Sequence, residues 1–586
     1  MGTVVSTSQT PAELCRGRFN DRAAETRRLS HRLKRYAKTQ KILIFAVIGF
    51  AVFDPSVGFI LVPFFLLQIP AVIVIGRLRR NIDRASLATE FYRHAVARIE
   101  DRWIGDGNTG EQYLGDNEVF ADDLDLFGKG SLFQFLCTTQ TSIGDDTLAA
   151  WLTQPANADE IHERQSAVRE LSKNLDLREQ LAVLELDRST FQPYAVIEWT
   201  SAPEVLPSRG ARVTGFVLAV AFAVVILSFL NSLGLSIWIA LCLVFLEFVF
   251  YVLFRSRLQP IMSNEKCAIA TLSYLSSVRK VLQKTSFETR RLSNIRRAIA
   301  EGALVPPWPV CAAYRLIVQL PLLLLLLCQF VPRVDRWRRS LAKPAEEGLR
   351  ALGELEAFSS LAQYSFIRPL AIFPTLVDTE KCYEAIGLGH PLVPADERVE
   401  NDLQLNDALQ LLLVSGSNMS GKSTMLRTVG VNAVLALCGA PVCAKQFRIS
   451  PFLIGTAMRF QDSLEVRTSH FYAVITRLRR VMDLQAGTRP LLFLIDEILQ
   501  GTNSHDRIRG AEAVVRKLID RGGIGLITTH DLELTRIVDT LDGRAANVHF
   551  ADSLLNGEIH FDYKMRPGVV ETSSAFALMR KMGLVD

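Results

Sequence analysis

A short glycine-rich segment restricts the fold of this chain more than any other feature of its sequence. It matches the pattern G-x-x-x-x-G-K-[ST] in full, with Gly416, Ser417, Asn418, Met419, Ser420, Gly421, Lys422, Ser423 and Thr424. The apolar residues 411–414 before it are typical of a buried strand, and the apolar pattern of residues 425–437 after it is typical of a helix. This strand–loop–helix context predicts an α/β domain whose loop wraps phosphate groups.

Each part of this loop has an expected role in binding ATP. The glycines allow backbone N–H groups to surround the phosphates, and the N-terminus of the following helix adds a favourable dipole. We expect Lys422 to contact the β- and γ-phosphates, and the Ser423 hydroxyl to coordinate Mg²⁺. ATP and Mg²⁺ are therefore the predicted cofactors.

Two further strand ends supply candidate catalytic groups. The apolar residues 491–495 are followed by Asp496 and Glu497. We expect Asp496 to hold the Mg²⁺ shell and Glu497 to polarise the attacking water, although two acids in this place can also cap the next helix. Residues 525–529 form a third predicted strand that ends at His530. Ligands of such sheets bind beyond the carboxyl ends of the strands, so His530 is placed to sense the γ-phosphate.

These motifs resemble the ATPase domain of MutS proteins, a branch of the ABC-type ATPases. The likeness includes residues 389–391, 401–402, the glycine-rich loop, residues 501–506, the pair Thr529 and His530, and residues 568–584. A weaker likeness, over residues 130–171, is to the start of the family's helical core domain. The resemblance implies a homodimer that closes head to tail, with Ser469 of one protomer facing the γ-phosphate held by the other.

The chain departs from the family pattern at several points. Arg467 stands where glycine is usual, and Val474 replaces a usual glutamate. The residue that stacks on adenine is not identifiable, and Gln461 either contacts Mg²⁺ or water or is an ordinary surface residue. No mismatch-reading domain and no DNA clamp are recognisable. Any DNA binding is therefore expected to rest on phosphate contacts, which are indifferent to sequence.

Two long apolar runs predict membrane hairpins. Residues 42–76 and 213–254 are nearly uncharged, are each interrupted by turn residues, and each exceed one span of about 20 residues. Basic residues flank both runs, which predicts that both hairpins enter and leave from the cytoplasm. A pair of buried core hairpins is the alternative. Residues 310–331 are either a fifth span or a buried helix, and Glu247 is interpreted as a carboxylate near the interface.

Basic charge is concentrated in two segments. Residues 1–41 carry ten Lys and Arg against three acids, and residues 262–300 carry eight against two, so their net charges are +7 and +6 in a chain of net charge +5. Such segments indicate a polyanionic partner. For residues 262–300, which include Arg290, Arg291, Arg296 and Arg297, either DNA phosphates or anionic lipid fits.

The sequence thus predicts a P-loop ATPase domain of the ABC and MutS type, preceded by an α-helical core that transmembrane hairpins interrupt. The expected parts are a basic tail, a first hairpin, a helical core segment, a second hairpin, a lever-like helical segment and the ATPase domain, at residues 1–41, 42–76, 77–212, 213–254, 255–380 and 381–586.

The leading hypothesis for function is a multi-pass protein of the inner, or cytoplasmic, membrane with its ATPase domain in the cytoplasm. ATP would switch a homodimer between open and closed states, and the lipid bilayer and DNA would be its partners. Alternatives are an ABC-type transporter ATPase, against which the absence of an LSGGQ-like signature argues, and a membrane tether that binds nucleotide with little turnover.

Overall fold

Two compact units make up the chain: the first is Met1–Thr139, Asp145–Arg178 and Glu356–Asp586, and the second is Gln140–Gly144 and Glu179–Leu355. The computed structural model describes residues 10–53, 61–115, 120–203, 209–230, 238–246, 248–249, 252, 265–303, 335–458, 470–484, 489–499, 504–555 and 558–570.

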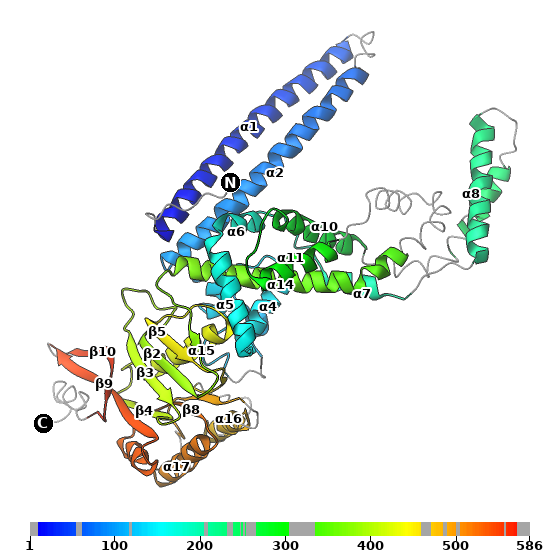
Figure 1. Cartoon of the computed structure of the whole chain (residues 1–586). Helices are drawn as coiled ribbons and strands as arrows, with labels where there is room; N and C mark the ends of the chain where they lie inside the picture. Colours follow the sequence, from blue (N-terminus) through cyan, green and yellow to red (C-terminus); the bar gives the residue numbers. More distant parts are fainter. Residues whose placement is uncertain are drawn as a thin grey trace. The chain divides into compact units, whose positions relative to one another are not determined.

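A six-stranded sheet lies at the centre of the C-terminal part of the first unit (Figure 1). Its strand order is β10-β9-β4-β8-β7-β6, and all neighbours are parallel except β10 and β9. The strands are β4 (Leu411–Gly416), β6 (Leu453–Ala457), β7 (Leu491–Ile495), β8 (Ile524–Thr529), β9 (Ala545–Leu555) and β10 (Glu558–Pro567). Every residue of β4, β7 and β8 is buried, as expected for a parallel sheet covered on both faces. Because β8 lies between β4 and β7, the carboxyl ends of these three strands meet at one edge.

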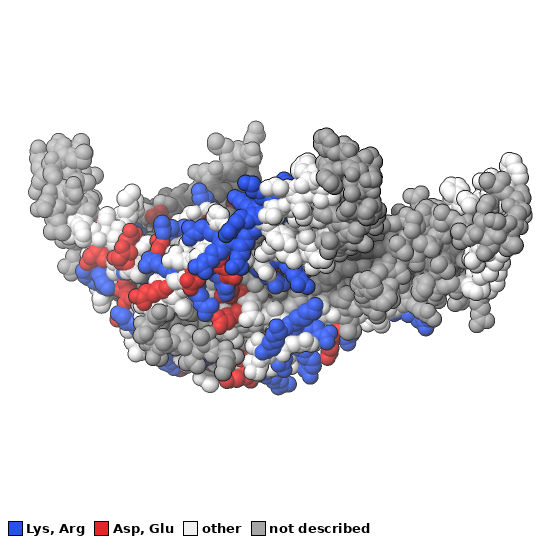
Figure 2. All heavy atoms as spheres, turned by 90° about the horizontal axis from the view of Figure 1, so that it is seen from above, with Lys and Arg blue, Asp and Glu red and all other residues white. Residues whose placement is uncertain are grey.

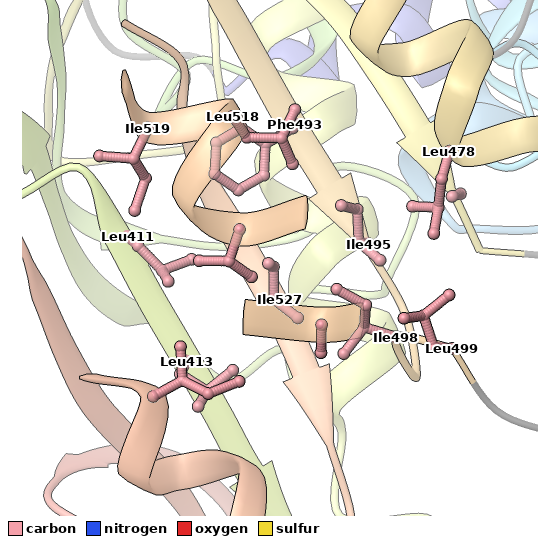
Figure 3. Close-up of a cluster of buried hydrophobic side chains, with 14 of the residues drawn as sticks. Leu411, Leu413, Leu478, Phe493, Ile495, Ile498, Leu499, Leu518, Ile519 and Ile527 are labelled. Atoms are coloured by element: carbon pink, nitrogen blue, oxygen red, sulfur yellow. The ribbon is translucent and has the colours of Figure 1, made fainter. Parts of the chain in front are cut away.

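Helices pack against this sheet and share its core. They are α15 (Lys422–Cys438), α16 (His470–Leu484), α17 (Ser504–Asp520) and the 3-10 helix η4 (Leu532–Thr540). In Figure 3, Leu411, Phe493 and Ile527 of the strands lie in one cluster with Leu478 of α16 and Leu518 of α17. Burial of each such side chain contributes about 1.5 to 3 kcal/mol. This core therefore fixes the strands whose ends form the site described below.

A second, four-stranded sheet has the order β1-β5-β2-β3. Its strands are β1 (Thr375–Leu376), β2 (Cys382–Leu388), β3 (Asn401–Asn406) and β5 (Gln446–Ile449). Tyr383 of β2 is fully buried, and its hydroxyl donates to the carbonyl oxygen of Val429 in α15 at 2.8 Å. Burial also raises the pKa of the Tyr383 hydroxyl far above its ordinary value, so it stays protonated. This bond ties the small sheet to the helix that follows the glycine-rich loop.

Two long helices near the N-terminus lie side by side (Figure 1). Arg16 pairs with Glu100 at 2.6 Å, and the Gln40 side chain donates to that of Gln68 at 3.1 Å, so the two helices run antiparallel. The helices up to residue 182 are α1 (Pro11–Phe53), α2 (Leu61–Ile99), η2 (Glu111–Tyr113), α3 (Leu132–Leu136), α4 (Ser142–Thr153), α5 (Ala158–Lys173) and α6 (Leu175–Ala182).

The second unit is helical in its described part. Its helices include α7 (Pro193–Ser201), α8 (Arg209–Leu230), α10 (Glu265–Leu282), α11 (Arg290–Gly302) and the beginning of α14 (Ala342–Ile367). Val196 and Trp199 of α7 share a core with Leu272 of α10. Next to Trp199, Arg338 pairs with Asp335 at 2.6 Å, and both side chains are fully buried. Burial of two charges is tolerated here because each has the other as partner.

The predicted location in the inner membrane, as a multi-pass protein with lipid as partner, is wrong. Among the helices in the described ranges, none combines the length and the apolar character needed to cross a bilayer. The apolar parts are Ile42 to Phe53 in α1, Leu61 to Gly76 in α2 and Val213 to Leu230 in α8. The described parts of α1 and α2 outside these apolar stretches carry many charged residues. The predicted hairpin turns, Glu247 and residues 310–331 lie outside the described residues.

A buried carboxylate joins the segment around residue 123 to the C-terminal sheet within the first unit. Asp123 has a fully buried side chain, and its Oδ2 atom accepts from Thr456 Oγ1 at 2.6 Å, from the Met458 N–H at 3.0 Å and from Arg477 Nη2 at 2.8 Å. Beside it, a Cβ atom added to Gly430 of α15 would lie 2.5 Å from a methyl carbon of Leu124. The segment around Asp123 therefore contacts β6, α16 and α15 together.

We expect Asp123→Ala to lower the free energy of unfolding by about 3 to 5 kcal/mol, because it removes a fully buried carboxylate that accepts hydrogen bonds from Thr456, Met458 and Arg477. The measurement is chemical denaturation of the purified chain. The neighbouring exposed Asp122→Ala serves as the control and should change the transition little. Equal effects of the two substitutions would contradict this role of Asp123.

Candidate active site

The glycine-rich loop connects the end of β4 to the start of α15. Gly416 and Gly421 have φ angles of +151° and +102°, which favour glycine over residues with a Cβ atom. A Cβ atom at Gly416 would also lie 2.9 Å from the Phe550 carbonyl oxygen and from Ser420 Oγ. The loop therefore folds only with small residues at these points, and it leads directly into the N-terminus of α15, where a helix favours anions.

Lys422 is the first residue of α15 and is buried. Its Nζ atom donates to the carbonyl oxygens of Gly416 and Ser417 at 2.9 and 2.8 Å, so the ammonium lies inside the loop. Burial lowers the pKa of Lys422, whereas the nearby charges of Glu497 and Asp496 act in the opposite direction. A cation held here by carbonyl dipoles and facing two carboxylates is suited to binding phosphate.

Two hydroxyl groups of the loop also fit a phosphate-binding role. Ser417 Oγ and Ser420 Oγ are buried, and neither has a hydrogen-bond partner among the residues that the structure describes. Buried polar atoms without a partner cost free energy unless a ligand satisfies them. Ser423 and Thr424, which come next, line the cavity described below.

The two predicted catalytic carboxylates follow β7. Asp496 N–H donates to the Ala457 carbonyl oxygen of β6 at 2.9 Å, at the end of the β6–β7 pairing. Glu497 has a φ angle of +52°, in the left-handed region that residues with a side chain adopt rarely. Its side chain lines the same cavity as Lys422. Strain of this kind is concentrated at functional sites.

His530 follows directly on β8. Its Nδ1 atom lies 3.4 Å from Glu497 Oε1, and the two side chains are 44% and 26% exposed. The structure thus brings Lys422, Asp496, Glu497 and His530 to one edge of the sheet, from three strands that are far apart in the sequence. The three predicted strand ends are therefore close together, and the roles of these residues in catalysis remain predictions.

A cavity of about 510 Å³ opens beside these groups. Its size is within the range of about 300 to 1,000 Å³ that is usual for small-molecule sites. The lining side chains are His390, Val393, Glu397, Arg398, Val399, Asn401, Asn418, Met419, Gly421, Lys422, Ser423, Thr424, Met425, Thr428, Glu497, Phe550 and Tyr563.

Several of these residues were missed as site residues by the sequence analysis. Phe550 and Tyr563 come from β9 and β10, and no motif marks either of them. Asn401 of β3 joins the two sheets here, because its side chain donates to the Tyr563 carbonyl oxygen at 3.0 Å and accepts from the Met565 N–H at 2.8 Å. Asn401 belongs to residues 401–402, whose likeness to the MutS family is described above. That likeness was the signal by which Asn401 could have been predicted as a site residue.

His390, which also belongs to a stretch similar to the family, is partly buried. Its Nδ1 atom accepts from the Leu392 N–H at 3.3 Å. Burial lowers the pKa of His390 to about 4, with the charge of Arg427 as a further cause. His390 therefore lines the cavity as a neutral imidazole at physiological pH.

The residues expected to hold Mg²⁺ are Ser423 and Asp496. In the described part of the chain there is no cluster of three or more His, Cys, Asp or Glu side chains that would form a complete metal site. Mg²⁺ in nucleotide sites keeps several waters and is bound by one or two protein groups plus substrate phosphates. One hydroxyl and one carboxylate near the loop fit this requirement.

Several predicted features lie outside the described residues, namely Ser469, Gln461, Arg467 and residues 501–503. The helix that follows Ser469, α16, begins at His470. Val474, the departure from the family pattern in α16, is 1% exposed and belongs to the core of the sheet. Its apolar character is thus explained by packing.

The basic residues of α11 are only partly available to a partner. Arg291 is half-buried and pairs with Glu354 at 2.9 Å, and Arg296 donates to the Thr285 carbonyl oxygen at 3.0 Å. Arg290 and Arg297 are exposed. Figure 2 shows Lys and Arg side chains over much of the described surface on one face, with Asp and Glu side chains among them.

Comparison with known proteins identifies two domains. Residues 412–585 match the family described as MutS domain V, and residues 118–190 match MutS domain III. The chain therefore contains MutS domains III and V, and domain V is an ATPase domain. The predicted α/β ATPase domain at the C-terminal side of a helical region is confirmed at this level, and so is the ATPase activity class.

Similar proteins carry the name of DNA mismatch repair proteins. The chain is 32% identical over 249 residues to "DNA mismatch repair protein MutS" of Natronomonas pharaonis, which is 41% of this chain and 28% of that protein. It is 30% identical over 263 residues to the protein of the same name from Geobacillus kaustophilus, covering 44% and 28%. With "DNA mismatch repair protein MutS 2" of Halobacterium salinarum, it shares 31% identity over 254 residues, covering 42% and 29%. The matched part spans less than a third of each relative.

Proposed function

We propose that this chain, which contains MutS domains III and V, binds ATP with Mg²⁺ at the edge of the six-stranded sheet and hydrolyses it to switch a homodimer between open and closed states. One observation supports this above all others. Lys422, Asp496, Glu497 and His530 meet at the carboxyl ends of three adjacent parallel strands, beside a cavity of about 510 Å³.

The proposed roles follow from the position of each group. The backbone N–H groups of residues 416–424 and the Lys422 ammonium bind the phosphates, and the buried hydroxyls of Ser417 and Ser420 add donors. Ser423 and Asp496 hold Mg²⁺, which when bound neutralises charge on the phosphates. Glu497 orients and deprotonates the attacking water, and His530, 3.4 Å from it, responds to the γ-phosphate.

The base of the nucleotide has candidate contacts in the same cavity. Tyr563 is 44% exposed and lines the cavity with Phe550 and Arg398. Aromatic rings and guanidinium planes are both suitable surfaces for stacking on a nucleobase. We therefore assign adenine to the part of the cavity bounded by Tyr563 and Arg398.

The dimer is part of the proposal because the resemblance to MutS proteins implies it. Ser469 of one protomer would face the γ-phosphate bound by its partner and so complete the site. The family named in the comparisons supports this assembly, and the mixed-protomer experiment at the end of the Discussion tests it.

We expect Glu497→Gln to bind ATP with nearly unchanged affinity and to hydrolyse it at least about 100-fold more slowly, since a general base contributes about 10²- to 10⁴-fold. Single-turnover hydrolysis and binding of a fluorescent ATP analogue measure the two effects separately. Lys422→Ala is the contrasting variant, because it should lose binding itself. Hydrolysis by Glu497→Gln at the wild-type rate would contradict the role of Glu497.

DNA is the second proposed partner, supported by the printed names of the similar proteins and by the charge of α11. Arg290 and Arg297 are exposed on this helix, whereas Arg291 and Arg296 are engaged within the unit. Exposed arginines bind phosphates without reading sequence. We therefore place the DNA contact on Arg290 and Arg297 and expect no preference for mismatched duplexes.

Replacement of both Arg290 and Arg297 by Ala should weaken binding to all duplexes alike. It should also reduce the slope of the logarithm of the binding constant against the logarithm of the salt concentration by about two units, one for each lost phosphate contact. Homoduplex and single-mismatch DNA are titrated side by side at several salt concentrations. Lys343→Ala is the control, because it removes an exposed positive charge from another helix. A mismatch preference that persists at high salt, or no binding to either duplex, would contradict the proposal.

A further inference from the structure

Thr528 is a buried polar residue at the point where the three strand ends meet. It is the penultimate residue of β8, has no exposed surface, and pairs with Val414 of β4. On its other side, the β7–β8 pairing ends one residue earlier, at Ile495 and Ile527. Thr528 therefore lies level with Asp496, the first residue beyond β7.

The Thr528 hydroxyl contacts both candidate catalytic residues. It accepts a hydrogen bond from the Glu497 backbone N–H at 2.9 Å, and it bonds to Asp496 Oδ1. A hydroxyl group has one hydrogen to donate. Because a backbone N–H can only donate, the oxygen of Thr528 must accept from Glu497, and its own hydrogen is free to go to the Asp496 carboxylate.

These two bonds act on different properties of the site. The bond to Oδ1 fixes the direction of the Asp496 carboxylate and leaves its other oxygen free of this contact. Glu497 adopts a left-handed backbone conformation with a φ angle of +52°. The hydrogen bond from its N–H to Thr528 fixes the peptide group that precedes this residue. A residue with a side chain persists in such a conformation only where its surroundings determine it.

Other buried threonines of the same sheet have different partners. Thr456 of β6 donates to Asp123, and the Thr529 hydroxyl accepts from the Asp531 N–H at 3.0 Å. Thr528 is the residue among these three whose hydroxyl reaches the acidic pair. Its role is therefore specific to its position and does not follow from being a polar residue in the sheet.

We propose that Thr528 is a positioning residue for hydrolysis, which aims the Asp496 carboxylate at its metal and holds Glu497 in reach of the attacking water. This inference rests on the proposed roles of Asp496 and Glu497. The partners that orient metal ligands typically change metal affinity or activity by about 10- to 100-fold when they are removed. Loss of the hydroxyl should act on catalysis and Mg²⁺ dependence and leave the phosphate-binding loop intact.

The test is Thr528→Val, which preserves the shape of the side chain and removes the hydroxyl. We expect the turnover number to fall by about 10- to 100-fold and the Mg²⁺ concentration for half-maximal hydrolysis to rise. Binding of a fluorescent ATP analogue without Mg²⁺ should change less than about twofold, because Lys422 and the loop are untouched. Thr528→Ser retains the hydroxyl and should restore both turnover and Mg²⁺ dependence, which a purely structural role of the side chain would not require.

Thr535→Val is the matched control, because its buried hydroxyl bonds only to the Leu532 carbonyl of its own helix in the described structure. Asp496→Asn and Glu497→Gln are measured in parallel. If these two retain wild-type hydrolysis, the proposed function fails. If they lose hydrolysis while Thr528→Val keeps wild-type turnover and Mg²⁺ dependence, the inference about Thr528 alone is overturned. If Thr528→Val does not fold, Thr528→Ser decides the question. A loss of turnover of about 10-fold or more in folded Thr528→Ser, which keeps the hydroxyl, overturns the inference as well.

Discussion

The parallel pairing of β8 with both β4 and β7 is the constraint on which the rest of the site depends. Leu411–Ser415 of β4 pair with residues 525–529 of β8, and residues 492–495 of β7 pair with residues 524–527 on its other side. The register is held by buried apolar side chains, so a slip by one residue would turn each of them to the opposite face. The same register brings the glycine-rich loop, the acidic pair and His530 to one edge. The chemistry of the site is thus a consequence of how the core packs.

The segment around residue 123 contacts the packed sheet and its helices through a small number of buried side chains. Asp123 bonds to β6 and to Arg477 of α16, while Leu124 packs against Gly430 of α15. Helix α15 begins in the glycine-rich loop, and α16 begins one residue after Ser469. A movement of either helix when nucleotide binds would therefore displace the residues that Asp123 and Leu124 contact. This contact is one physical connection between the residues matched by MutS domain III and the ATPase domain.

The sequence marks local motifs, and it does not mark contacts across strands. Lys422, Asp496, Glu497 and His530 were found because each follows an apolar strand and carries a recognisable neighbour. Thr528, Tyr563 and Asp123 were missed because their importance arises from hydrogen bonds to residues tens to hundreds of positions away. The membrane prediction was wrong: it rested on hydropathy alone, and no helix of the described residues combines the length and the apolar character needed to cross a bilayer. The catalytic and binding roles of the predicted site residues and of Ser469, and the predicted domain boundaries, remain predictions.

The central claim is that the site at this edge works only when a second protomer completes it. The measurement is the ATPase rate of an equal mixture of Lys422→Ala and Ser469→Ala chains, each of which should be inactive alone. In a head-to-tail dimer, a mixed pair has one site with both residues intact. Random exchange of protomers makes about half of the dimers mixed, and each mixed dimer has one working site of two. The mixture should therefore recover about a quarter of the wild-type rate. If the mixture stays as inactive as its parts, or if Ser469→Ala alone hydrolyses ATP at the wild-type rate, the account is contradicted.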